Sequence, residues 1–317
     1  TNLDVTQNLA LSTLWFFDNQ LTNLDVSQNT ALQNLVCDEN QLTSLDVSSN
    51  LALTQLMCGN NQLTNLDVSQ NTALFRFDCY SNQLTSLDVS QNTALSRLYC
   101  QNNQLTSLDV SQNTALEHLD CGNIQLTSLD VSNNTALVYL GCTSNQLTSL
   151  DVAQNLALTY LYCGDNQLTN LDVTQNLALS ILRFFDNQLT NLDVSQNTAL
   201  EDLNCSSNQL TSLDVKNGNN TNISQFFSTG NSALTCINVD DVTYSTNNWT
   251  YIDTQHYFSA NCVAHGCTDS LACNYNSSAT IDDGSCVFSS ASVETVIECD
   301  SYTWIDGVTY ASSNNTA

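Results

Sequence analysis

The chain has 317 residues and a formal net charge of −27, because 31 Asp and Glu residues are opposed by only four Lys and Arg residues. This charge, with no basic stripe, argues against binding to nucleic acids or to anionic membrane surfaces. Apolar residues make up 42% of the chain, so we expect a folded, very acidic protein rather than a disordered one. No apolar run approaches the length of about 18 residues that indicates a membrane span.

From the first residues to about residue 218 the sequence repeats every 21 residues. The tripeptide Leu-Asp-Val marks each copy. Its eleven aspartates follow one another without an insertion or deletion, at Asp4, Asp25, Asp46, Asp67, Asp88, Asp109, Asp130, Asp151, Asp172, Asp193 and Asp214. Constant spacing of this kind predicts a solenoid, in which each coil buries its apolar positions against the same positions of the next coil.

Each copy contains two similar half-turns. One copy reads L-x-x-L-x-C-x-x-N-x-L from Leu32 to Leu42 and continues as L-x-x-L-D-V-x-x-N to Asn50. Over residues 1–218 this resembles the leucine-rich repeat, and in particular the bacterial 21-residue class with nested periodicity known as the IRREKO type. The resemblance implies a mainly β, right-handed and nearly straight solenoid of about eleven coils, with two sheet-like faces and little helix. At about 4.8 Å per coil, the rod would be roughly 50 Å long.

Two asparagine positions recur in nearly every copy, and we name them the first and second asparagine ladders. Buried amides at such positions can satisfy backbone groups where the chain turns between strands. The first ladder comprises Asn19, Asn40, Asn61, Asn82, Asn103, Asn145, Asn166, Asn187 and Asn208, and it is interrupted at Ile124. The second comprises Asn8, Asn29, Asn50, Asn71, Asn92, Asn113, Asn134, Asn155, Asn176 and Asn197, and ends at Gly218.

Eight of the fourteen cysteines share one repeat position: Cys37, Cys58, Cys79, Cys100, Cys121, Cys142, Cys163 and Cys205. Phe16 and Phe184 take the same position in two other copies, which indicates a buried apolar site where free cysteine packs as a small hydrophobic residue. Side chains in register point in parallel, which suits disulfide geometry poorly. We therefore predict free, buried thiols, with a metal role as the alternative.

The aspartates of Leu-Asp-Val lie between two inward residues, so strand alternation turns their carboxylates outward. We expect a solvated, hydrogen-bonded face, with bound cations as the alternative. Neighbouring carboxylates also resemble a retaining glycosidase pair, but eleven equivalent pairs cannot specify one active site. The sequence has no H-E-x-x-H, G-x-S-x-G or glycine-rich phosphate loop. We predict a protein that is not an enzyme and has no cofactor.

Variation between the copies concentrates on the outward positions around L-x-x-L-x-C. They carry Trp15, Phe17, Phe75, Arg76, Tyr80, Arg97, Tyr99, His118, Tyr139, Tyr160, Tyr162, Arg183 and Phe185. Aromatic and Arg side chains dominate binding hot spots, and proteins resembling this one generally hold partners on this face. We predict a ligand-binding face for a protein or glycan, with neutral drift as the alternative. Tyr139, Tyr160 and Tyr162 fall on adjacent coils and could form a stacking platform.

After Val215 the period ends, and residues 219–263 are predicted to cap the solenoid. Leu234, Cys236 and Ile237 still fit one irregular coil, and aromatic residues such as Trp249 can cover the exposed end. The segment resembles the capping region that follows such repeats in secreted proteins of the Bacteroidetes. We predict a disulfide between Cys236 and Cys262 in this cap.

Residues 264–290 resemble a short module, G-C-T-D…A-C-N-Y-N…D-D-G-S-C, of extracellular Bacteroidetes proteins. Six cysteines in the last 82 residues favour an oxidising compartment, and disulfides are expected at Cys267, Cys273 and Cys286. Oxygen ligands in this module could hold Ca²⁺, with ordinary turn chemistry as the alternative. They are Asp269, Asn274, Asn276, Asp282 and Asp283.

Residues 291–317 resemble the opening of a further β-rich module, so we expect a larger polypeptide. Ser270 and Ser301 resemble O-glycosylation acceptors of the Bacteroidetes. N-glycosylation sequons occur at Asn219, Asn222, Asn248 and Asn276.

We therefore predict a secreted or cell-surface protein that binds and scaffolds protein or glycan partners and does not insert into membranes. The alternative is a structural subunit of an extracellular, glycosylated filament. An open first coil leaves apolar surface and strand edges that could join rods head to tail.

Overall fold

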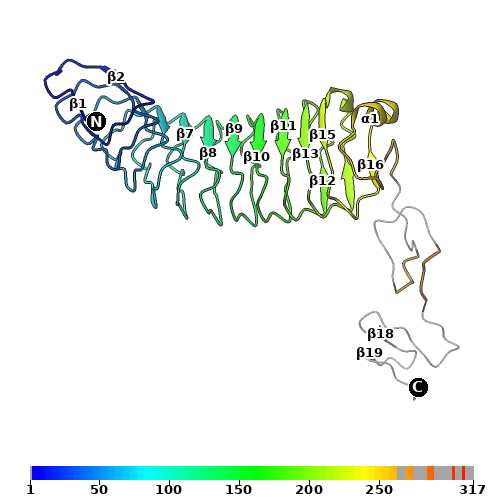
Figure 1. The fold of residues 1–317 in the computed structure, drawn as a ribbon. Helices are drawn as coiled ribbons and strands as arrows, with labels where there is room; N and C mark the ends of the chain where they lie inside the picture. Colours follow the sequence, from blue (N-terminus) through cyan, green and yellow to red (C-terminus); the bar gives the residue numbers. More distant parts are fainter. Residues whose placement is uncertain (1, 263–268, 274–283, 289–301, 304–308, 311–317) are drawn as a thin grey trace. The chain divides into compact units, whose positions relative to one another are not determined.

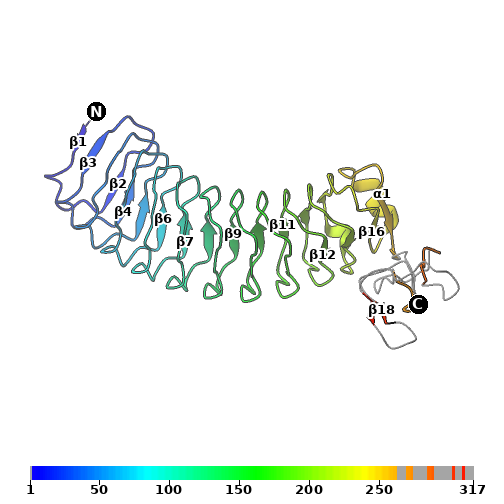
Figure 2. The ribbon, with the colours of Figure 1, turned by 90° about the horizontal axis from the view of Figure 1, so that it is seen from below.

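The structure is a computed structural model that describes residues 2–262, 269–273, 284–288, 302–303 and 309–310. The chain divides into two compact units, Thr1–Ala260 and Asn261–Ala317. The first unit is an elongated solenoid of about twelve turns that is only gently bowed (Figures 1 and 2). It is mainly β with little helix, as the 21-residue period predicts.

One side of the solenoid carries an 11-stranded parallel sheet, which we call the long sheet. Successive strands are offset by 21 residues, from Leu14 opposite Leu35 to Leu182 opposite Leu203. The last pair joins Leu203 to Phe226 across an offset of 23 residues. The strands are β2 (Thr13–Trp15), β4 (Asn34–Val36), β5 (Gln55–Met57), β6 (Arg76–Asp78), β7 (Arg97–Tyr99), β8 (His118–Asp120), β9 (Tyr139–Gly141), β10 (Tyr160–Tyr162), β11 (Ile181–Arg183), β13 (Asp202–Asn204) and β15 (Gln225–Phe227).

The opposite side, which carries Leu-Asp-Val and which we call the aspartate side, has strands only near its two ends. They are β1 (Asn2–Asp4) with β3 (Asn23–Asp25), and β12 (Asn191–Asp193), β14 (Ser212–Asp214), β16 (Cys236–Asn238) and β17 (Tyr257–Ser259). The prediction of two sheet-like faces is therefore wrong for the middle coils. Near one end Val194 N still reaches Asp214 O, but at 3.3 Å. The long sheet follows the inner side of the bow (Figure 1), whereas the Leu-Asp-Val segments of the middle coils run on its outer side without forming strands.

The first asparagine ladder forms the corners after the strands of the long sheet. Asn40 Nδ2 donates to Cys37 O, Asp38 O and, in the preceding coil, Phe16 O at 3.0–3.1 Å. Its Oδ1 accepts from Leu21 N at 3.1 Å. The predicted role of the ladder is confirmed. The residue before each ladder asparagine has a positive φ, as at Glu39 (φ 56°), so each corner is a tight turn that few residue types enter easily.

The second asparagine ladder makes the corners after Leu-Asp-Val. Asn50 Nδ2 donates to Val26 O at 3.0 Å and Asn29 O at 2.9 Å in the preceding coil. At the C-terminal end Asn217, one residue before Gly218, continues this ladder by donating to Asn197 O at 3.0 Å. The first ladder is likewise continued by Asn231, which donates to Cys205 O at 3.0 Å. Both ladders thus reach one coil further than the strict period indicates.

The core is one continuous column of Leu, Val and Cys side chains. The eight cysteines that share one repeat position are free and fully buried, and Phe184 occupies the same position in another coil. The prediction of buried free thiols is confirmed. Burial raises the pKa of these thiols well above the ordinary value, as at Cys58, so they stay protonated and unreactive in the folded protein.

The C-terminal end of the solenoid is closed by a cap. It contains the 3₁₀ helix η1 (Asn220–Asn222), strands β15 to β17 and the helix α1 (Val242–Asn248). Trp249 is buried, stacks on Phe226 with 4.2 Å between ring centroids, and donates from Nε1 to Ile223 O at 2.9 Å.

Disulfides occur in the C-terminal region. Cys236, Cys262 and Cys286 are disulfide-bonded, whereas the pairing of Cys236 with Cys262 stays a prediction. Cys267 lies outside the described residues. Cys273 is exposed, and its backbone N–H donates to Val287 O at 2.8 Å. In the second unit, β18 (Tyr302–Thr303) pairs antiparallel with β19 (Thr309–Tyr310).

Candidate binding face

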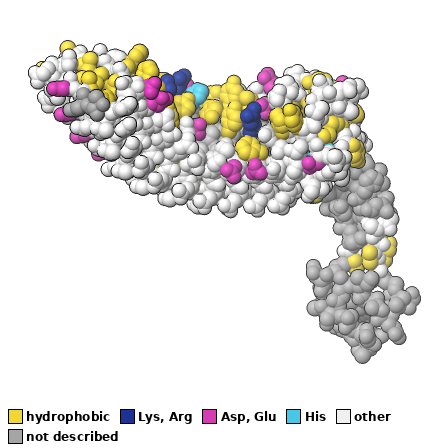
Figure 3. All heavy atoms as spheres, in the orientation of Figure 1, with side chains coloured by type: hydrophobic (Ala, Val, Ile, Leu, Met, Phe, Trp, Pro, Cys, Tyr) yellow, Lys and Arg dark blue, Asp and Glu magenta, His cyan; other side chains and the backbone are white. Residues whose placement is uncertain are grey.

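The outward side chains of the long sheet stand in three columns along the solenoid: one residue before, one residue after and three residues after the buried strand centre. All thirteen residues predicted for the binding face lie in these columns or directly beside them. Trp15, Phe17, Phe75 and Tyr160 are exposed, with Trp15 the most open at 66%. Arg76, Tyr80, Arg97, Tyr99, His118, Tyr139, Tyr162, Arg183 and Phe185 are half-buried. Figure 3 shows hydrophobic, Arg and His side chains gathered over the long sheet.

An aromatic platform lies near the middle of this face. Tyr139 is its centre, with ring centroids 6.0 Å from His118, 6.4 Å from Tyr160 and 5.5 Å from Tyr162. Burial, and then the charge of Arg97, lower the pKa of His118, so its ring is neutral at pH 7. The three tyrosines predicted to lie together therefore do so on two adjacent coils, and His118 extends them to a third.

Two arginines of the face are neutralised within the chain. Arg76 makes a bidentate contact with the buried Asp78, with Nη2 to Oδ2 at 2.7 Å and Nε to Oδ1 at 3.1 Å. Its guanidinium carbon is 5.8 Å from the ring centroid of Tyr99. Desolvation raises the pKa of Asp78, and Arg76 opposes this rise. The result is a triad of Arg, Asp and Tyr on neighbouring strands.

A second triad lies toward the C-terminal end of the sheet. Arg183 binds the buried Asp202 through Nε to Oδ1 at 3.2 Å and through Nη2 to Oδ2. Its guanidinium carbon is 5.7 Å from the centroid of Tyr162. Tyr162 thus belongs both to this triad and to the aromatic platform.

The sequence prediction missed four carboxylates of the same columns: Asp38, Asp78, Asp120 and Asp202. Their repeat positions could have revealed them, because each stands where another coil carries an aromatic, arginine or small residue. Asp38 Oδ1 accepts from Gly59 N at 2.8 Å, and burial raises its pKa to about 6. Asp120 Oδ1 accepts from Gly122 N at 3.1 Å, and burial raises its pKa too.

Two glycines let aromatic rings lie flat against the sheet. A Cβ at Gly59 would lie 2.6 Å from the Tyr80 ring, and one at Gly164 would lie 2.6 Å from the Phe185 ring. The rings of Tyr80 and Phe185 therefore pack directly on the backbone of these two glycines.

The aspartates of the aspartate side are exposed, apart from the half-buried Asp214. Each typically caps the chain two residues on, as Asp67 Oδ1 accepts from Ser69 N at 2.9 Å. These bonds lower the pKa of Asp67 below its ordinary value. The hydrogen-bonded reading of this face is supported. Among the described residues, no group of three or more His, Cys, Asp or Glu side chains has a metal-binding arrangement.

The remaining predicted sites are described only in part. Asp269 is exposed, and its Oδ1 accepts from Leu271 N at 2.9 Å. Its predicted calcium partners Asn274, Asn276, Asp282 and Asp283 lie outside the described residues, as does Ser301. Ser270 and Asn222 are exposed. Asn219 Nδ2 donates to Thr198 O at 3.2 Å and Asn248 Nδ2 to Tyr244 O at 2.8 Å. The calcium and glycosylation sites stay predictions.

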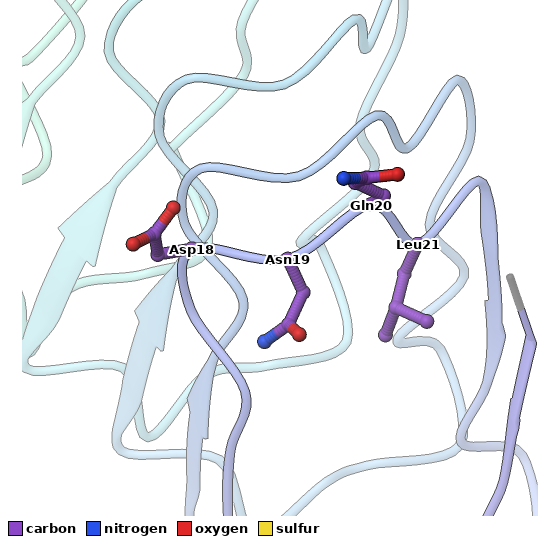
Figure 4. Close-up of a pocket in the computed structure, with 4 residues that line it drawn as sticks. All are labelled: Asp18, Asn19, Gln20 and Leu21. Carbon is purple, nitrogen blue, oxygen red and sulfur yellow. The ribbon is translucent and has the colours of Figure 1, made fainter.

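A separate pocket lies at one corner near the N-terminal end of the solenoid (Figure 4). Asp18, Asn19, Gln20 and Leu21, four consecutive residues, line it. Its lining has one carboxylate and no other titratable side chain, so the long-sheet face remains the candidate site.

Comparison with known proteins agrees with this geometry. The family model "Leucine Rich repeats (2 copies)" matches residues 93–134. Residues 93–134 therefore contain leucine-rich repeats. The solved functional domain of InlJ from Listeria monocytogenes, which includes a cysteine ladder, is 36% identical, with a TM-score of 0.60 over 78% of this chain. The chain spans 64% of that domain. The repeats of this chain also contain a column of cysteines, and all eight are buried.

Two more distant solved structures share the leucine-rich repeat fold. The Leptospira interrogans protein LIC12759 is 24% identical with a TM-score of 0.64, covering 80% of this chain and 68% of that one. The plant peptide hormone receptor RGFR1, solved in complex with RGF2, is 16% identical with a TM-score of 0.52, covering 81% and 54%. No curated protein sequence matches the chain. Within the residues that the structure describes, no helix has the length and apolarity of a bilayer span.

Proposed function

We propose that the chain is part of a non-catalytic, extracellular or cell-surface leucine-rich repeat protein that holds a protein or glycan partner on the face of the long sheet. The aromatic platform of His118, Tyr139, Tyr160 and Tyr162 carries the proposal. Tyrosine offers a large apolar surface with a polar edge, which suits both sugar rings and protein loops. Mutual ring contacts hold the platform in place, so a partner orders few side chains on binding.

The cysteines support an oxidising location. Cys236, Cys262 and Cys286 are disulfide-bonded, and disulfides persist mainly outside the cytosol. The eight buried thiols are compatible with such a compartment because burial keeps them protonated and away from oxidants. The solenoid can therefore keep its buried cysteines reduced while the cysteines of the C-terminal region form disulfides.

The test is binding of the purified chain to arrays of glycans and of extracellular proteins. A Tyr139→Ser/Tyr160→Ser double variant should weaken binding to any positive spot by at least about tenfold, since aromatic anchors dominate interfaces. An Asp67→Asn/Asp88→Asn double variant on the aspartate side is the matched control and should bind as the wild type does. Equal binding by all three proteins would contradict the proposal.

A filament of rods joined head to tail remains the second candidate. The cap closes one end of the solenoid with α1 and the buried Trp249, so such a joint would need the surface of the cap rather than a bare coil. Electron microscopy of native material would show filaments if the second candidate holds. If the micrographs show separate rods and no filaments even at high protein concentration, the second candidate is ruled out.

Calcium binding by residues 264–290 is a further part of the proposal. Titration with CaCl₂ in a calorimeter should give a saturable heat that an Asp282→Asn/Asp283→Asn variant lacks. If the wild-type chain gives no heat of binding, residues 264–290 do not bind calcium.

A further inference from the structure

The long-sheet face contains two complete triads and a third that lacks its cation. In the first, Arg76 pairs with Asp78 beside Tyr99; in the second, Arg183 pairs with Asp202 beside Tyr162. Asp120 lies between them. Its register places it opposite Tyr99 on β7, just as Tyr99 lies opposite Asp78 on β6. Where the first triad has Arg76, this coil has His118.

Asp120 has no ion pair with another described residue. Its carboxylate accepts from Gly122 N at 3.1 Å and interacts with the neighbouring Tyr139, which lowers its pKa. A carboxylate has about four acceptor sites, so capacity for a bidentate guanidinium remains. The neighbouring His118 is neutral because burial and Arg97 lower its pKa, and it supplies no compensating charge. A half-buried carboxylate without a cation is costly, and a cation arriving from outside would relieve that cost.

Asp120 is only half-buried, so a cation can approach its carboxylate from solvent. In the column of Asp120 the next residue along the solenoid is Gly141, followed by Tyr162. A Cβ at Gly141 would lie 3.0 Å from Asp120 Oδ1 and 3.2 Å from the Tyr139 ring. The carboxylate and the Tyr139 ring therefore lie close over Gly141, where a side chain would crowd both, and Asp120 itself stays half-exposed to solvent. Of the four carboxylates in the columns of the long sheet, Asp38 also has no ion pair with a described residue, but it is only 6% exposed and less accessible.

We propose that Asp120, flanked by Tyr139 and Tyr162, receives an arginine side chain from a basic segment of a protein partner. The arginine would complete the third triad as Arg76 and Arg183 complete the other two. A chain with a net charge of −27 attracts basic segments from a distance, while the planar fork of arginine matches a carboxylate and stacks on tyrosine better than lysine does. This inference rests on the proposed function and names the chemistry of its partner.

The test uses two fluorescein-labelled Gly/Ser peptides, one with a central arginine and one with citrulline, its neutral isostere. Fluorescence anisotropy should show a Kd at least about tenfold lower for the arginine peptide, because charge-assisted bidentate pairs are strong. Asp120→Asn should abolish this preference. Asp109→Asn, on the aspartate side, removes the same charge and should keep it. An unchanged preference in Asp120→Asn would overturn the proposal.

His118→Arg provides an independent check that keeps Asp120 in place. The new guanidinium would stand toward Asp120 as Arg76 stands toward Asp78, so it should occupy the site and remove the preference for arginine. His118→Gln, which adds no charge, should retain it. Circular dichroism of each variant would establish that the solenoid is folded.

The outcome is separable from the proposed function. If a partner found on the arrays is lost with Tyr139→Ser/Tyr160→Ser while Asp120→Asn keeps the arginine preference, the face binds but Asp120 is not its anchor. If the arginine preference depends on Asp120 but no array partner depends on the tyrosines, the proposed function fails and the cation site stands.

Discussion

The long sheet and the aspartate side are built from nearly the same half-turn, yet they differ in pairing, charge and variability. The long sheet pairs through eleven strands, and its outward residues change from coil to coil. The aspartate side repeats Leu-Asp-Val with strands only near its ends. On the aspartate side the carboxylates accept hydrogen bonds from the local backbone. On the long sheet Asp38, Asp78 and Asp202 are buried and Asp120 is half-buried, beside arginines, glycines or aromatic rings. Similar core patterns thus support a structural side and a candidate recognition side.

The largest expected effect concerns the corners that join the two sides. Asn103→Ala removes an amide that donates to Cys79 O and Cys100 O at 3.0 Å and accepts from Leu84 N at 3.0 Å. Buried backbone groups would lose their partners, at a cost of about 3 kcal/mol in the free energy of unfolding. Urea denaturation measures the change. Gln104→Ala, at the exposed neighbouring position, is the control, and equal loss in both variants would contradict the role of the ladder.

Protonation of the aspartates on the two sides should change the stability of the solenoid in opposite directions. Burial raises the pKa of Asp38 from 3.8 to about 6, so the folded state binds this proton more tightly than the unfolded state. Stability should therefore rise as the pH falls from 7 through 6 toward 4, by about 2 kcal/mol for this group. Asp38→Asn should raise stability at pH 7 and flatten the profile in that window. A profile identical to that of the wild type would refute this account.

On the aspartate side the hydrogen bond from Ser27 lowers the pKa of Asp25. Such groups contribute stability above the ordinary pKa of 3.8, and this contribution is lost as the pH falls further. Thermal unfolding between pH 3 and pH 7 should therefore pass through a maximum between the two windows. A monotonic increase of stability with pH would contradict the opposed titrations.

The buried cysteines should be silent toward thiol reagents in the folded protein. Iodoacetamide followed by peptide mass spectrometry should leave Cys100 and Cys121 unmodified under native conditions and modify both in urea, since burial keeps each thiol protonated. Rapid native modification of either residue would show that the core column opens.

The smallest effect should come from a single aspartate of the uniform side. Asp67→Asn retains an acceptor for Ser69 N and should leave the denaturation midpoint unchanged, while Asp67→Ala should lower it slightly. A large loss in Asp67→Asn would mean that the charge itself supports the solenoid.

Much of this architecture could be predicted from the period. The 21-residue spacing, the ladder asparagines and the Cys or Phe position follow from the need of every coil to bury and satisfy the same groups as its neighbour. The prediction of two sheet-like faces failed because strand pairing between coils cannot be inferred from the sequence of one copy. The aspartate side looks like a second strand in sequence, but in the structure it forms strands only near its two ends.

The site divides in the same way. Alternation along a strand was enough to place Tyr139, Tyr160 and Tyr162 on one face, because outward positions follow from the pleat alone. The sequence alone therefore determined the solenoid, its core and the location of its variable face. Only the tertiary structure decided that Arg76 and Arg183 are neutralised by Asp78 and Asp202 while Asp120 is not. Such pairings join residues on neighbouring strands or across one pleat, and they depend on side-chain reach and on small neighbours such as Gly141, where a Cβ would crowd Asp120 and Tyr139.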